Sequence, residues 1–284
     1  MPSPTVLTGH DWLGLCRRSA AGLRELLAQA PTSRERVVET GVVGEGGDRT
    51  LVIDRAAEDV VFRELERLHD DGARFTAVSE ERGIVGFGDP GVLVVIDPID
   101  GSLNAKRGLA HHALSIAVAD GPTMADVRLG YVYDVGTAEE WRAVSGAGAW
   151  LDDVPLGPLP TERRTPDGRL EVVAIESAAP RRLAAAVPAL EVCAHRVRAI
   201  GSIAISLCQV AGGRVDAMAS LGRCRSVDAA AAQLVVREAG AHVAFPSLAE
   251  PLGAPLAELT GRSPVVAALT TGGLALAATL PVDR

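Results

Sequence analysis

One apolar run in this chain must be buried on both faces, and an acidic turn follows it directly. Residues 92–96 read VLVVI and residues 97–104 read DPIDGSLN. An apolar run without alternation, bounded by glycine and proline, predicts a strand inside a sheet that is covered on both sides. Because proline cannot donate a ladder hydrogen bond, we expect the strand to stop before Pro98. The fold must then place Asp97 at the carboxyl end of a central strand and Asp100 in the turn that follows.

The acidic turn has the composition of a site for cations and phosphate. Gly101 and Ser102 offer backbone N–H groups next to the carboxylates of Asp97 and Asp100. Carboxylates beside free amides can hold hard cations and a phosphate group together. Aspartate and glycine are also common in turns for purely conformational reasons. The turn alone leaves both interpretations open, so the other acidic positions must decide between them.

Length and composition bound the class of protein. The 284 residues suffice for a large core and two sub-domains, and the Pro- and Gly-rich stretch 155–170 is the best boundary. We therefore expect an N-terminal α+β half, 1–154, and a C-terminal α/β half, 155–284. A net charge of −8 and only 3% aromatic residues argue against binding to nucleic acid or anionic membranes. A small anionic substrate remains compatible, because bound metal inverts the local field.

The cysteines and the N-terminus predict a cytoplasmic protein. No CxxC or zinc spacing occurs, so free buried thiols in a reducing compartment are expected. We expect no signal peptide, because no basic segment precedes an apolar run, and no stretch reaches the length of a membrane span. The four scattered cysteines are Cys16, Cys193, Cys208 and Cys224.

Hydrophobic periodicity predicts helices and strands along the whole chain. Thr8 and Asp11 suggest a capping box that opens a helix through about Leu27. The polar, Gly-rich residues 31–50 are expected to form a loop. The other expected helices are residues 51–69, 180–191, 202–212, 223–240 and a short one after Thr271. The expected strands are residues 75–79, 92–96, 113–119, 127–134, 139–144, 148–153, 171–177, 195–200 and 214–220.

Five acidic residues lie at strand ends or helix starts, where side chains from different elements can converge. Singly, each has a plain alternative: Asp54 suits a helix dipole, and Glu80 suits a solvated loop. Together, carboxylates without histidine or cysteine partners suit Mg²⁺, an oxygen-seeking ion. His111 and His112 precede a strand, where a loop or core position is the commoner alternative to a place in the site. The five acids are Asp54, Glu80, Asp97, Asp100 and Asp228.

On several motifs the sequence resembles the inositol monophosphatase family. The most specific are SEE at 79–81, DPIDGS at 97–102 and VDAAAAQLVVREAG at 227–240, and looser matches lie at 47–58 and 200–217. Within the family, the chain is most similar to the archaeal branch with dual inositol monophosphatase and fructose-1,6-bisphosphatase activity. The resemblance implies the layered αβαβα sandwich of the sugar phosphatases, in the α/β (α+β) class. It also implies a homodimer.

The resemblance assigns roles to particular residues. It implies two or three Mg²⁺ ions, with Asp54 supporting the metal site. Ser102, at the family's threonine position, would act with Glu80 to orient and deprotonate a metal-bound water. The implied metal ligands are Glu80, Asp97, the Ile99 carbonyl, Asp100 and Asp228. The expected substrate contacts are Gly101, Ser102, Ser202 and Arg225.

Departures from the family pattern concern the substrate. Ala105 follows Asn104 where the family often has phenylalanine, and Val227 replaces a tryptophan. No acid matches the one that contacts inositol in the animal enzymes, whereas Arg225 fits the R-x-x-D spacing of the archaeal branch. We expect hydrolysis of inositol monophosphate, fructose-1,6-bisphosphate or both. The alternatives are a 3′-phosphoadenosine 5′-phosphate phosphatase, a histidinol-phosphatase, or a non-catalytic protein that binds a phosphorylated ligand.

Overall fold

The computed structural model describes residues 9–30, 36, 39–43, 49–261 and 263–281. The helices in this part of the chain are α1 (Trp12–Gln29), α3 (Val52–Asp70), α4 (Ser102–Arg107), α5 (Pro180–Cys193), α6 (Ile203–Ala211), α7 (Ser226–Glu238) and α8 (Thr271–Ala277), with a 3₁₀ turn at Met124–Asp126. The first strands are β1 (Glu39–Val43), β2 (Arg49–Leu51), β3 (Thr76–Ser79), β4 (Gly83–Gly86), β5 (Leu93–Asp100), β6 (Ala113–Ala119), β7 (Val127–Asp134) and β8 (Glu139–Val144). The remaining strands are β9 (Gly148–Leu151), β10 (Val154–Pro155), β11 (Leu170–Glu176), β12 (Ala194–Arg198), β13 (Ala217–Ser220), β14 (His242–Ala244) and β15 (Val266–Ala268).

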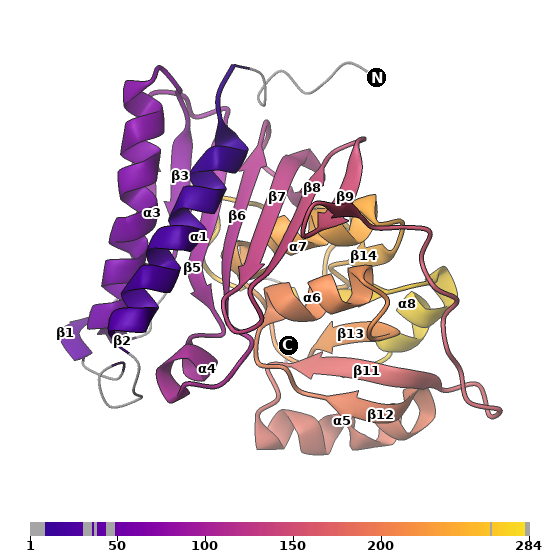
Figure 1. Ribbon diagram of the computed structural model, residues 1–284. Helices are drawn as coiled ribbons and strands as arrows, with labels where there is room; N and C mark the ends of the chain where they lie inside the picture. Colours follow the sequence, from indigo (N-terminus) through magenta and orange to yellow (C-terminus); the bar gives the residue numbers. More distant parts are fainter. Residues whose placement is uncertain (1–8, 31–35, 37–38, 44–48, 262, 282–284) are drawn as a thin grey trace.

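The elements stack in five layers (Figure 1). Helices α1 and α3 cover one face of an eight-stranded sheet of order β10-β9-β8-β7-β6-β5-β3-β4. Helices α6 and α7 lie between this sheet and a five-stranded sheet of order β12-β11-β13-β15-β14. Helices α5 and α8 pack on the outer face of the second sheet. This arrangement confirms the expected layered αβαβα fold.

Strand β5 shows why the apolar run had to be buried on both sides. Val94 and Ile96 belong to the hydrophobic cluster under α1 and α3, whereas Leu93 and Val95 belong to the cluster around α6 and α7. Successive side chains of a strand point to opposite faces, so a fully covered sheet needs an apolar residue at every position. Helices α6 and α7 are buried along almost their whole length, as expected for helices between two sheets.

The strand prediction was wrong at Pro98, because β5 continues to Asp100. The pairing of β5 with β6 shifts register between Asp97 and Asp100, and β3 has already ended opposite Ile96. The break in the ladder leaves Pro98 at a position where no backbone donor is required. The connection before β5 also differs from a simple hairpin, because β4 pairs with the outer side of β3 and β5 then runs parallel to β3.

Two predictions near the N-terminus need correction. The N-cap of α1 is Asp11, whose Oδ1 accepts a hydrogen bond of 2.9 Å from the Gly14 N–H. Thr8 lies outside the described residues. Within the stretch predicted as a loop, β1 and β2 form an antiparallel pair, because each supplies the backbone partners of the other.

The expected helices at 51–69 and after Thr271 are confirmed as α3 and α8, and all four cysteines are free and buried. Residues 156–169 connect the last strand of the first sheet to β11, the first strand of the second. The division into halves 1–154 and 155–284 stays a prediction about folding units. No helix within the described ranges is both long and apolar enough to cross a membrane.

Candidate metal and phosphate site

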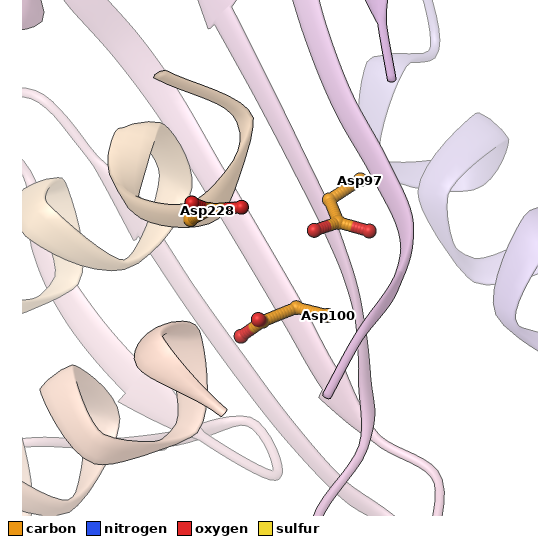
Figure 2. A group of neighbouring side chains, drawn as sticks. All are labelled: Asp97, Asp100 and Asp228. Carbon is orange, nitrogen blue, oxygen red and sulfur yellow. The ribbon is translucent and has the colours of Figure 1, made fainter. Parts of the chain in front are cut away.

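Three buried aspartates meet where the sheet, α7 and the DPIDGS turn come together. Oxygen atoms of Asp97, Asp100 and Asp228 lie within 4.8 Å of one another. Figure 2 shows the three carboxylates facing a common space, two from the end of β5 and one from the first turn of α7. Close packing of α7 brings Asp228 there. A Cβ atom at Gly130 of β7 would lie 2.3 Å from the Ala231 carbonyl oxygen, so only glycine lets the helix approach this closely.

The turn itself depends on a glycine. Gly101 has φ +86°, and a Cβ atom there would lie 2.9 Å from the Gly201 carbonyl oxygen and 3.0 Å from that of His111. An L side chain would therefore meet both a conformational strain and two backbone atoms. Asn104 fastens the same region, because its Nδ2 donates hydrogen bonds to the carbonyls of His111, at 2.9 Å, and Ile200, at 2.8 Å. The motif thus fixes the backbone that carries the acids.

Asp100 is held from the side of α6. Its Oδ2 accepts hydrogen bonds from the Ser202 hydroxyl, at 2.5 Å, and from the Ala204 N–H, at 2.7 Å. Burial and the nearby Asp228 carboxylate raise the pKa of Asp100 to about 7, although these two hydrogen bonds favour the ionised form. Ser202 is buried and bonded to Asp100, so in this structure its hydroxyl orients an acid. Its expected contact with substrate stays a prediction.

Asp97 has one satisfied and one unsatisfied oxygen. Oδ1 accepts a hydrogen bond of 3.0 Å from the Ile99 N–H, whereas Oδ2 is buried and has no partner among the described residues. Burial, together with the carboxylates of Glu80, Asp100 and Asp228, raises the pKa of Asp97 well above its usual range. An unsatisfied buried oxygen in a set made only of oxygen donors fits a hard divalent cation. The residues present therefore suit Mg²⁺.

Glu80 and Asp228 share one cation, the guanidinium of Arg225. Nη2 of Arg225 lies 2.9 Å from Asp228 Oδ1, and Nη1 forms an ion pair with Glu80 Oε1. Burial raises the pKa of Glu80, and the guanidinium opposes this shift. Burial also acts to lower the pKa of Arg225, but the carboxylates of Asp228 and Glu80 outweigh it and raise that pKa. Arg225 therefore faces the acids rather than solvent.

A cavity lies beside the cluster, and five of the ten predicted site residues line it. The predicted residues outside its lining are Asp100, Gly101, Ser202, Arg225 and Asp228. Lys106 also lines it, with Nζ 3.7 Å from Asp54 Oδ2, and this lysine was not predicted. The sequence spacing could have indicated this lysine, because Lys106 follows Ser102 by four residues. Residues four apart lie on the same face of a helix such as α4. The cavity is lined by Asp54, Glu80, Glu81, Asp97, Pro98, Ile99, Ser102 and Lys106.

Two buried glutamates that sequence reasoning missed support the site from behind. Glu176, at the end of β11, accepts hydrogen bonds from the N–H groups of Ile200, at 3.0 Å, and Gly201, at 2.9 Å. It thereby holds the loop that carries Ser202. Glu58 on α3 accepts a hydrogen bond from the Ser79 hydroxyl, one residue before Glu80. Burial raises the pKa of both glutamates.

The fold and the site together define a class of layered αβαβα proteins in which three buried aspartates form a cluster that could hold a metal ion. The solved inositol monophosphatase-fructose 1,6 bisphosphatase that is the MJ0109 gene product superposes with a TM-score of 0.79, over 94% of this chain and 98% of its own, at 24% identity. The model of the inositol monophosphatase family matches residues 14–275. The chain therefore belongs to the inositol monophosphatase family.

Curated relatives agree with this assignment, although their names differ. A fructose-1,6-bisphosphatase/inositol-1-monophosphatase from Methanothermobacter thermautotrophicus is 30% identical over 245 residues, which is 82% of this chain and 84% of the relative. A protein named Nus factor SuhB from Pasteurella multocida is 30% identical over 239 residues, with coverage of 82% and 85%. The similarity thus includes an archaeal dual enzyme of the branch that the motifs indicated.

Proposed function

We propose that this protein is a Mg²⁺-dependent phosphomonoester hydrolase that acts on inositol monophosphate, fructose-1,6-bisphosphate or both. The observation that carries the proposal is the convergence of Asp97, Asp100 and Asp228 beside a polar cavity. Membership of the family supports hydrolysis of a phosphate monoester, and the name of the archaeal relative supports the pair of substrates. A water molecule is the proposed nucleophile, delivered on the side of Glu80 and Ser102.

The proposed metal ligands would hold two or three Mg²⁺ ions. When bound, such ions lower the pKa of coordinated water, neutralise phosphate oxygens and stabilise the leaving alkoxide. Asp97 and Asp100 would act as ionised ligands, so each must release the proton that burial favours. The proposed ligands are Glu80, Asp97, the Ile99 carbonyl, Asp100 and Asp228.

The chain's own groups would position substrate and move the proton. Ser102 and Glu80 line the same cavity, so the Ser102 hydroxyl can orient the water while Glu80 accepts its proton. Asp54 would support the metal site from its place beside Lys106. The N–H groups of Gly101 and Ser102 remain the proposed phosphate contacts. Ser202 would contribute by orienting Asp100.

The choice of substrate is proposed to depend on Arg225. A guanidinium forms two parallel, charge-assisted hydrogen bonds with a phosphate group, and a second phosphate is present only on a bisphosphorylated sugar. Arg225 lies beside the cluster, where a second phosphate at the cavity edge could meet it. We also propose that the protein is a cytoplasmic homodimer that needs no nucleic acid or membrane partner.

A phosphate-release screen tests the proposal directly. Inositol-1-phosphate, fructose-1,6-bisphosphate, 3′-phosphoadenosine 5′-phosphate and histidinol phosphate are each supplied with Mg²⁺, then with EDTA, then with Mg²⁺ restored. We expect the first two to be hydrolysed, EDTA to abolish release and Mg²⁺ to restore it. Selective release from the third or fourth substrate would change the assigned substrate. No release from any of them would favour a non-catalytic protein that binds a phosphorylated ligand.

A further inference from the structure

Arg225 contacts oxygen atoms of two of the proposed metal ligands, Glu80 Oε1 and Asp228 Oδ1. We propose that its guanidinium is an internal cation that competes with Mg²⁺ for Glu80 and Asp228, so that metal binding displaces the side chain from these carboxylates. The inference deepens the proposed function and rests on its metal site. In the metal-free protein, the Arg225 side chain would then occupy some of the carboxylate oxygens that bind the metal.

The hydrogen bonds of Arg225 account for both carboxylate oxygens of Asp228. Oδ1 accepts from Nη2 at 2.9 Å and from Nε at 3.2 Å. Oδ2 accepts from the backbone N–H of Arg225 at 2.8 Å. Nη1 then reaches across to Glu80, which lies 145 residues earlier in the chain. One side chain therefore joins the end of β3 to the start of α7 across the position where these two acids would share a cation.

The acids of the cluster differ in whether their oxygen atoms already have a partner. The guanidinium occupies Glu80 Oε1 and Asp228 Oδ1, whereas Asp97 Oδ2 has no partner among the described residues. A guanidinium and a divalent ion cannot both contact the same carboxylate oxygens without strong repulsion between like charges. An ion at Asp97 that also takes Glu80 Oε1 and Asp228 Oδ1 as ligands would therefore displace the Arg225 side chain.

The side chain can leave without unfolding its surroundings. It lies at the N-cap of α7 and is 24% exposed, against 9% for Asp228. The backbone bond from Arg225 to Asp228 does not depend on the guanidinium, so only side-chain torsions need to change. The released guanidinium would no longer be held by Glu80, which lines the cavity, and could then meet a second phosphate. Metal binding would thus prepare the contact proposed for bisphosphorylated substrates, and linkage makes this coupling reciprocal.

Calorimetric titration of substrate-free protein with Mg²⁺ tests the competition. Arg225→Gln should bind Mg²⁺ about 10- to 100-fold more tightly than wild type, because charge-assisted hydrogen bonds no longer have to be broken. Arg223→Gln is the matched control, since it removes an equal charge from the exposed arginine two residues away. Its affinity should equal that of wild type. Equal or weaker binding by Arg225→Gln would overturn the inference.

Two further measurements keep the inference testable if Arg225→Gln folds poorly. They also distinguish a failure of this inference from a failure of the proposed function. Arg225→Lys keeps the charge but loses the guanidinium fork, so its Mg²⁺ affinity should lie between those of wild type and Arg225→Gln. In wild-type protein, the NMR signal of the Arg225 Nε–H should shift when Mg²⁺ replaces EDTA. A signal that stays unchanged while Mg²⁺ binds would refute the displacement alone. Failure of wild type to bind Mg²⁺ would refute the metal site of the proposed function as well.

Discussion

Replacing Asp100 with asparagine should stabilise the metal-free protein, although it removes a proposed metal ligand. Both hydrogen bonds that Asp100 accepts in the structure, from Ser202 and Ala204, go to Oδ2. A carboxamide oxygen can take that position and keep both bonds. The amide NH₂ then takes the position of Oδ1, and carboxylate oxygens of Asp97 and Asp228 lie within 4.8 Å of an Asp100 carboxylate oxygen. Asparagine therefore fits this site without leaving a donor opposed to another donor.

The size of the effect follows from the pKa of Asp100. Burial and the neighbouring Asp228 raise this pKa from 3.8 to about 7, and one pKa unit corresponds to about 1.36 kcal/mol. Between these two values the folded protein keeps a proton that the unfolded chain has released. Wild-type stability must therefore fall as pH rises from about 4 to 7, by at most about 4 kcal/mol from this group. Asparagine carries no such charge, so at pH 8 we expect a gain of about 1–4 kcal/mol.

Urea unfolding in EDTA, from pH 4 to pH 8, measures this difference. Asp216→Asn is the matched control, because Asp216 is also buried but accepts the Arg163 N–H on one oxygen and the Val172 N–H on the other, both at 2.9 Å. Asparagine there leaves one donor unsatisfied and should cost about 1–3 kcal/mol. The reasoning is refuted if Asp100→Asn at pH 8 is destabilised as much as Asp216→Asn.

The other predictions concern turnover and assume saturating Mg²⁺. Asp100→Asn should lose several orders of magnitude of phosphate release, on the order of 10³-fold or more, because a charged ligand is missing. Ser102→Ala should lower kcat by roughly 10²–10⁴-fold with little change in KM, and weakened binding at normal kcat would instead make Ser102 a phosphate contact. Arg225→Ala should lower kcat/KM for fructose-1,6-bisphosphate by about 10–100-fold and affect inositol-1-phosphate much less. Equal losses on both substrates would exclude a role for Arg225 in selectivity.

The elements that the sequence predicted best are those whose constraints are local. Strand β5 was predictable because a short apolar run that is bounded by glycine and proline favours a strand covered on both faces. Asp97 and Glu80 were expected at one edge because each directly follows a predicted strand. In the structure β3 and β5 are parallel, with Ser79 opposite Ile96, so the two acids do lie at the same side. Asp228 was expected at a helix start, and α7 begins two residues before it. The hydrophobic period of an element and the residues that bound it are properties of short segments. They can therefore be recognised without knowledge of the tertiary packing.

The features that the sequence did not predict depend on distant partners. Nothing near Arg225 indicates that its guanidinium meets Glu80, because that contact requires α7 to be docked on the sheet. The bond from Ser202 to Asp100 likewise joins residues 102 positions apart. Pro98 was assigned to a strand end because the ladder on either side of it was unknown. Each of these outcomes is a property of the assembled layers and not of a segment.

In the metal-free protein, the repulsion between the buried carboxylates is reduced in two ways. Burial and mutual repulsion oppose charge on buried carboxylates, and they raise the pKa values of Asp97, Asp100 and Glu80. For Asp97 and Asp100, the raised pKa means that burial and the neighbouring carboxylates favour the protonated form more strongly than in an exposed carboxyl group. For Glu80 and Asp228 an arginine from the chain supplies the missing positive charge. A divalent ion that binds all four carboxylates would release protons from Asp97 and Asp100. It would also displace the guanidinium from Glu80 and Asp228. The same acids that would make the site catalytic are thus kept compatible with folding before any metal arrives.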